Sequence, residues 1–65
     1  MSVGENIRTR RLDLGMTQEE LGSAVEVGRS MIAQYERGSK VPNLIIGRSI
    51  ARVFKCSMEE LFEEV

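Results

Sequence analysis

The chain of 65 residues contains no histidine, no tryptophan and a single cysteine, Cys56. Without histidine the sequence has no metal-ligand cluster, and one thiol forms no internal disulfide. We find no nucleophile–base pair and no glycine loop that would cradle a phosphate, so neither an enzyme nor a bound cofactor is expected. Cys56 has no neighbouring activator, which favours an inert, partly buried thiol in a reducing compartment.

Long apolar runs are missing as well. No stretch approaches the roughly 20 apolar residues that a membrane span requires, and the N-terminus lacks the apolar region of a signal peptide. The sequence has no internal repeat and no linker rich in Ser, Pro or Gly. We therefore predict one cytoplasmic domain over residues 1–65, without a membrane partner. Its core is small, so it is marginally stable unless its helices pack well or it pairs with another chain.

Negative charge is concentrated at one end of the chain. The net charge of −1 alone counts against a nucleic-acid binder. However, residues 1–58 carry nine Lys/Arg and six Asp/Glu, a net of +3, whereas four glutamates lie within the last seven residues. Two interpretations remain open: a basic face opposed by an acidic tail held away from phosphate, or a tail that is simply a solvated helix surface.

Apolar spacing predicts an all-α fold of five helices. The first spans about Val3 to Leu14, and the second and third occupy about 18–25 and 29–37. The fourth begins near Asn43, a good N-cap after a proline, and the fifth opens with a capping box of Ser57 and Glu60. The predicted core comprises Ile7, Leu14, Leu21, Val25, Ile32, Tyr35, Ile50, Phe54 and Leu61.

The stretch TQEELGSAVEVGRSMIAQYERG, from Thr17 to Gly38, is the most informative part of the chain. Thr17 and Glu20 form a capping box that starts one short amphipathic helix. The pattern breaks at 26–28, resumes with Ile32 and Tyr35, and closes at a glycine. Two helices joined by so short a turn indicate a helix-turn-helix over about 17–38, whose second helix can enter a groove of DNA.

The chain resembles the Xre/Cro/C1-type helix-turn-helix family, which includes the lambdoid-phage repressors and Cro proteins. The resemblance covers nearly the whole chain and rests on these segments in order: Leu14-Gly15-Met16, Thr17-Gln18-Glu19-Glu20-Leu21, Arg29-Ser30-Met31-Ile32, Tyr35-Glu36-Arg37-Gly38, Pro42 and Ser57-Met58-Glu59-Glu60-Leu61. It implies a compact five-helix, lambda-repressor-like domain that binds double-stranded DNA, without indicating which DNA sequence.

Arg11 lies on the otherwise apolar stripe of the first helix. An unpaired buried charge is very costly, so Arg11 needs a carboxylate unless it extends to solvent. The resemblance supplies the partner, Glu36, and we expect the ion pair.

The third helix is expected to read base edges, because Ile32 and Tyr35 must face inward. Its base-reading candidates are Arg29, Ser30, Met31 and Gln34. Arg29 suits guanine and Gln34 suits adenine, whereas Met31 either touches a thymine methyl or packs inside. An ordinary solvated surface is the alternative for Arg29 and Gln34.

Phosphate contacts are expected from residues that flank the third helix. The candidates are Thr17, Gln18, Arg37, Lys40 and Asn43. Gln18 begins the second helix, where free N–H groups favour an anion, and the resemblance implies that it binds phosphate and braces the third helix. Thr17 caps its helix, a role compatible with a phosphate contact.

Five positions depart from the family pattern. Glu26 stands at a turn position that is usually Gly, Gly28 replaces a Ser/Thr cap, and Gly22 replaces Ala. Gly47 replaces a large apolar residue, and Lys55 stands where a helix-ending Gly is common. These departures predict a less stable, more adaptable domain.

The resemblance also implies a homodimer on an inverted repeat, since one domain reads few base pairs. Exposed Ile45, Phe62 and Val65 are the candidate dimer patch. We expect a transcription regulator, most simply a repressor, either standing alone or as the head of a longer protein, with no small-molecule ligand. The alternative is a protein-binding module, such as an antitoxin or regulatory partner, on the same fold.

Overall fold

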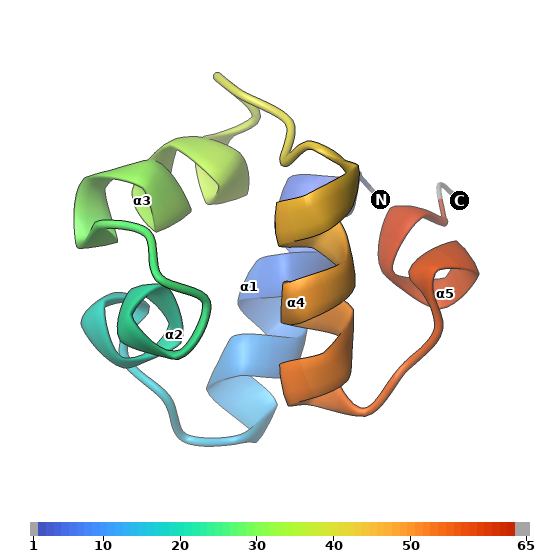
Figure 1. Cartoon of the computed structure of the whole chain (residues 1–65), viewed down its shortest axis with the longest axis horizontal. Helices are drawn as coiled ribbons and strands as arrows, with labels where there is room; N and C mark the ends of the chain where they lie inside the picture. Colours follow the sequence, from blue (N-terminus) through green and yellow to red (C-terminus); the bar gives the residue numbers. More distant parts are fainter. Residues whose placement is uncertain (1, 64–65) are drawn as a thin grey trace.

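The computed structural model describes residues 2–63 and contains only helices in that range. They are α1 (Val3–Asp13), α2 (Gln18–Ala24), α3 (Arg29–Arg37), α4 (Leu44–Phe54) and α5 (Met58–Phe62). Helix α1 contacts α3, α4 and α5, and α2 packs on α3. Figure 1 shows α2 and α3 on one side of α1 and α4, with α5 on the other. None of these helices is long and apolar enough to span a bilayer. The predicted five-helix, all-α fold is confirmed.

Side chains that accept backbone N–H groups define where four helices begin. The predicted capping boxes at Thr17 and Ser57 are both present, and Asn43 Oδ1 accepts the N–H of Ile46 at 2.9 Å. A further box, Ser2 with Glu5, starts α1. The Ser-x-x-Glu spacing at 2–5 carries this signal in the sequence.

The turn between α2 and α3 is tight and partly strained. Glu26 has φ 62°, as its place at a position usually held by Gly suggests, and Gly28 caps α3 without a side-chain hydrogen bond. The N–H of Val27 donates to Gly22 O at 2.9 Å. A Cβ at residue 22 would lie 2.7 Å from Val27 O. The expectation that Gly22 only weakens its helix is therefore wrong, because alanine would collide with the turn.

The core agrees with the sequence except at one residue. The buried apolar residues are Ile7, Leu21, Val25, Ile32, Tyr35, Ile50, Ala51, Phe54 and Leu61. Leu14 was predicted to be buried and is 56% exposed. Helix α1 ends at Asp13, Leu14 is its C-cap, and the chain turns at Gly15 with φ 69°, so Leu14 lies beyond the part of the apolar stripe that the core covers.

The surface of α4 and α5 differs from prediction in two places. Ile45 is exposed as expected. Helical spacing predicts that Leu44 lies with Ile50 and Phe54 on the apolar half of α4, but Leu44 is exposed too. Phe62 was predicted to be exposed and is half-buried. Its ring lies where a larger residue 47 would stand: a Cβ on Gly47 would be 3.1 Å from Phe62 Cζ and 3.2 Å from Met58 Cε. The glycine thus makes room for α5. Val65, the third member of the candidate patch, lies outside the described residues.

We expect Glu26→Gly to raise the free energy of unfolding by about 1 kcal/mol, because it removes the cost of a left-handed conformation at a residue with a Cβ. Urea unfolding measures the change. The matched control is Ser23→Gly, an exposed position inside α2, which should lower stability by about 0.5 kcal/mol. Equal losses from both variants would contradict the strain at Glu26.

Candidate nucleic-acid interface

Helix α3 turns one face to the core and leaves the rest accessible. Ile32 and Tyr35 are buried, and Arg29 and Ser30 are exposed at the start of the helix. Gln34 is half-buried, and its Nε2 donates to Ser30 Oγ at 3.5 Å. The amide of Gln34 and the hydroxyl of Ser30 therefore lie on the same face of α3, one turn apart.

Met31 lies at the border of this face. It is half-buried and packs against the core cluster. Of the two roles that the sequence left open for Met31, its position favours packing against the core over contact with a thymine methyl.

A buried ion pair fixes α3 on α1. Arg11 Nε donates to Glu36 Oε2 at 2.6 Å, and Arg11 Nη2 donates to Glu36 Oε1 at 3.1 Å. The two side chains are only 9% and 5% exposed. The hydrogen bonds to Glu36 raise the pKa of Arg11, although burial acts in the opposite direction. The expected pairing of Arg11 with Glu36 is therefore present, and Arg11 does not extend to solvent.

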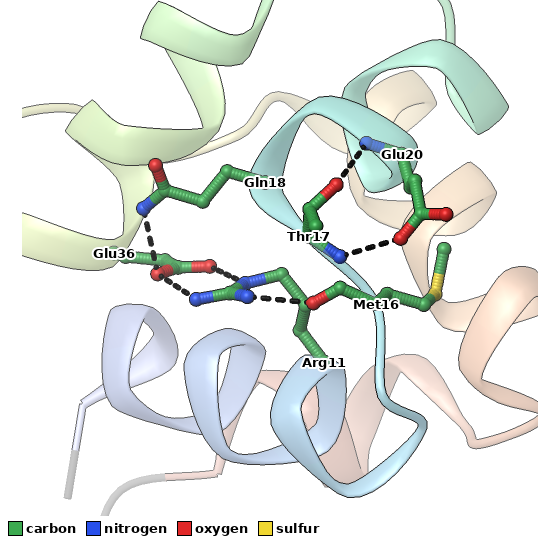
Figure 2. A network of polar contacts seen from close by, with 6 residues as sticks. All are labelled: Arg11, Met16, Thr17, Gln18, Glu20 and Glu36. Atoms are coloured by element: carbon green, nitrogen blue, oxygen red, sulfur yellow. Dashed lines mark hydrogen bonds and ion pairs between the residues drawn. The ribbon is translucent and has the colours of Figure 1, made fainter.

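The same pair reaches α2 and the loop before it (Figure 2). Arg11 Nη1 donates to Met16 O at 2.7 Å, and Gln18 Nε2 donates to Glu36 Oε1 at 3.1 Å. Gln18 thus braces α3. Its amide carries a second N–H that this bond does not use.

The remaining phosphate candidates surround α3. Thr17 Oγ1 accepts the N–H of Glu20 at 3.0 Å, and its hydroxyl proton is free of that bond. Arg37 and Lys40 are exposed, as is Asn43, whose Oδ1 caps α4. Arg8, which is not among the residues predicted to contact phosphate, is exposed on α1 and lines a hollow together with Arg29 and Arg37.

Charges are separated in space as well as in sequence. Arg11–Glu36 is the single ion pair among residues 2–63, so none of the exposed arginines around α3 forms an ion pair with a carboxylate in that range. The acidic helix α5 lies across α1 and α4 from α3 (Figure 1). Asn6 Nδ2 holds its C-terminal end on α1 by donating to Leu61 O and Glu63 O, at 3.0 and 2.7 Å. The carboxylates are therefore kept away from α3.

The described residues offer neither a metal site nor a reactive thiol. No three His, Cys, Asp or Glu side chains among them lie close enough together to hold a metal ion. Cys56 is half-buried, and burial raises the pKa of its thiol, which disfavours the reactive thiolate.

The helices α2 and α3 are short and joined by a tight turn, and α3 is buried on one side and exposed on the other. This arrangement defines a helix-turn-helix domain of the lambda-repressor type. A helix-turn-helix family model matches residues 7–61. The chain therefore belongs to the Xre/Cro/C1-type helix-turn-helix family.

Relatives and solved structures agree with this assignment. The chain is 46% identical over 56 residues to an uncharacterized HTH-type transcriptional regulator of Archaeoglobus fulgidus, covering 86% of this chain and 80% of the relative. The structure of the P22 c2 repressor in complex with a synthetic operator matches with a TM-score of 0.94, at 33% identity, over 97% of this chain and 96% of the repressor chain. The restriction-modification controller protein C.AhdI of Aeromonas hydrophila matches with a TM-score of 0.85, at 28% identity, over 92% and 91%.

We expect Glu36→Gln to lower the free energy of unfolding by about 3 kcal/mol, because it leaves the buried Arg11 guanidinium without its carboxylate. Chemical denaturation measures the loss. Replacing both partners, Arg11→Met with Glu36→Met, should cost less than the single change, since no unpaired charge remains buried. The exposed Glu19→Gln on α2 serves as control and should stay within about 0.5 kcal/mol. A single variant as stable as this control would show that the pair does not hold α3.

Proposed function

We propose that the protein is a transcription regulator that binds double-stranded DNA in a sequence-specific manner by placing α3 in the major groove. The observation that carries the proposal is the exposed N-terminal face of α3, anchored from behind by the buried pair of Arg11 and Glu36. A helix held rigidly on one side and polar on the other suits base reading. The likeness to a repressor solved on a synthetic operator supports the same docking.

Base reading falls to Arg29, Ser30 and Gln34. Arg29 donates two N–H groups to guanine O6 and N7, and Gln34 pairs with adenine N6 and N7. Ser30 is short and adapts to either base. Met31 contributes only from the edge of this set, because it packs against the core.

Phosphate contacts position the domain on the duplex. We assign them to Thr17 and Gln18 on one side of α3 and to Arg37, Lys40 and Asn43 on the other. Thr17 and Gln18 each have a donor proton left after the bonds described above, and Arg37 and Lys40 are exposed. These contacts carry affinity without sequence preference.

A two-fold dimer on an inverted repeat would double the number of base pairs read. Ile45 is 76% exposed, and its neighbours Val41 and Leu44 are 65% and 68% exposed. We therefore assign the dimer contact to these three exposed residues and not to Phe62, which is half-buried. A dimer bound across a promoter represses transcription by occlusion.

A protein-binding module on the same fold is the second candidate. The same exposed Val41, Leu44 and Ile45 favour it, since an apolar surface also suits a different partner chain. Loss of function on changing Ile45, with none on changing Arg29 and Gln34, would support this candidate over DNA binding.

We expect selection from a random duplex pool to return a two-fold symmetric sequence whose affinity falls as salt rises. Arg29→Ala and Gln34→Ala should each weaken binding by about 1–3 kcal/mol and relax the preference at one position in each half-site. Titration of both variants on the selected duplex measures this. Arg10→Gln is the control, because Arg10 lies with Asn6 and Asp13 away from α3. Binding that ignores both salt and sequence would refute the proposal.

We expect Ile45→Ser to shift the protein to monomer in sedimentation, because it removes the most exposed apolar side chain of the patch. Affinity for the full inverted repeat should drop at least about tenfold, whereas affinity for a half-site should not change. The control is Leu14→Ser, which also replaces an exposed apolar side chain by serine but lies outside the patch; Leu14 is 56% exposed. Unaltered dimerisation of the Ile45 variant would exclude this patch.

A further inference from the structure

A shallow hollow of about 410 Å³ lies between α1 and α3, beside the helix-turn-helix. It is lined by Arg8 of α1, Gln18 of α2, and Arg29, Ala33, Glu36 and Arg37 of α3. Two helices, α1 and α3, thus bring three arginines to one depression. Only the α1 member of this set stands outside the helix-turn-helix.

Helical spacing explains why Arg8 faces this hollow. It precedes Arg11 by three residues on α1, so the two side chains lie on the same side, one turn apart. Arg11 turns inward and pairs with Glu36, whereas Arg8 is exposed. Arg8 therefore lies beside the buried ion pair, and it lines the same hollow as Glu36 of α3.

Nothing in the hollow neutralises Arg8. The only carboxylate there, Glu36, already accepts both bonds from Arg11 and a third from Gln18. No ion pair to Arg8, Arg29 or Arg37 is present among residues 2–63. With Arg11 cancelling Glu36, the residues that line the hollow leave a local charge of +3.

The ligand class that suits such a hollow is an anion with several oxygens, and a guanidinium binds phosphate oxygens well. Gln18 and Arg37, to which we assign phosphate contacts, line the same depression. A backbone phosphate near them lies within reach of a long side chain on the neighbouring helix.

We propose that Arg8 binds a phosphate of the DNA backbone in this hollow, so that the DNA-binding surface extends beyond the helix-turn-helix onto α1. The inference rests on the proposed function. Because phosphates are present in every duplex, Arg8 contributes affinity and positions the domain, and it does not select sequence.

The test is the salt dependence of DNA binding, measured on the selected inverted-repeat duplex and on a random duplex of equal length. Arg8→Gln should lower the slope of log K against log salt by about 0.9 for each bound chain. Its affinity at low salt should fall by about three- to tenfold on both duplexes alike. Arg8→Lys keeps the charge and should keep the slope.

The matched control is Arg10→Gln, two residues away on the same helix. Arg10 lines a different depression with Asn6, Thr9 and Asp13. Hydrogen bonds with Ser57 lower the pKa of Glu60 on α5, and the charge of Arg10 adds to this effect. Arg10 therefore faces away from the hollow and should leave the slope unchanged. Arg8 is exposed, so its variant should fold; thermal unfolding checks this, and Arg8→Ala provides a second variant.

The outcomes separate this inference from the proposed function. A wild-type protein that binds no duplex, or binds without salt dependence, would refute the function itself. Wild-type binding with equal slopes for Arg8→Gln and Arg10→Gln would overturn the role of Arg8 and leave the function standing. A changed sequence preference with an unchanged slope would also overturn it, because Arg8 would then act on bases and not on phosphate.

Discussion

The buried pair of Arg11 and Glu36 is the interaction on which the presentation of α3 depends. Three of the five guanidinium donors of Arg11 are used, two on Glu36 and one on Met16 O. One side chain therefore ties α3 and the loop before α2 to α1, and Gln18 adds α2 through the same carboxylate. A fork-shaped donor fixes both distance and orientation. The angle at which α3 leaves the domain follows from this geometry.

This pair also shapes the electrostatic surface. It uses the one carboxylate that lines the hollow between Arg8, Arg29 and Arg37. Glu59, Glu60 and Glu63 belong to α5 or its end, across α1 and α4 from α3 (Figure 1). A net charge of −1 is thus compatible with a strongly basic face. Overall charge is a poor guide in a chain whose last, acidic helix lies away from α3 (Figure 1).

The sequence predicted well wherever the signal was local. Capping residues Thr17, Asn43 and Ser57 placed three helix starts, and the apolar stripe showed that Arg11 needs a carboxylate. The identity of that carboxylate came from family resemblance, because Glu36 lies 25 residues away in sequence. The base and phosphate contacts are not settled by the fold and stay proposals.

The failures share a different cause. The exposure of Leu14 depends on where α1 ends, and the exposure of Leu44 and Phe62 depends on whether a neighbouring helix covers them. Periodicity assigns a residue to a side of its helix but does not say whether another element reaches that side. Gly22 and Gly47 predict a less stable domain, the first because helix propensity considers a helix alone and the second because the family has a large apolar residue there. In the fold each glycine is the place where a second element comes close.

That observation applies to both ends of α3. A Cβ at residue 22 would meet the carbonyl of Val27, in the turn that leads into α3, and a Cβ at Gly4 would meet the carbonyls of Tyr35 and Glu36, near its C-terminal end. Backbone contacts at two glycines, together with one buried ion pair, hold the helix from behind. Its outward side chains, Arg29 and Ser30 above all, take no part in the core. Residues on that face can therefore change to suit a new DNA sequence while the way α3 is presented stays the same.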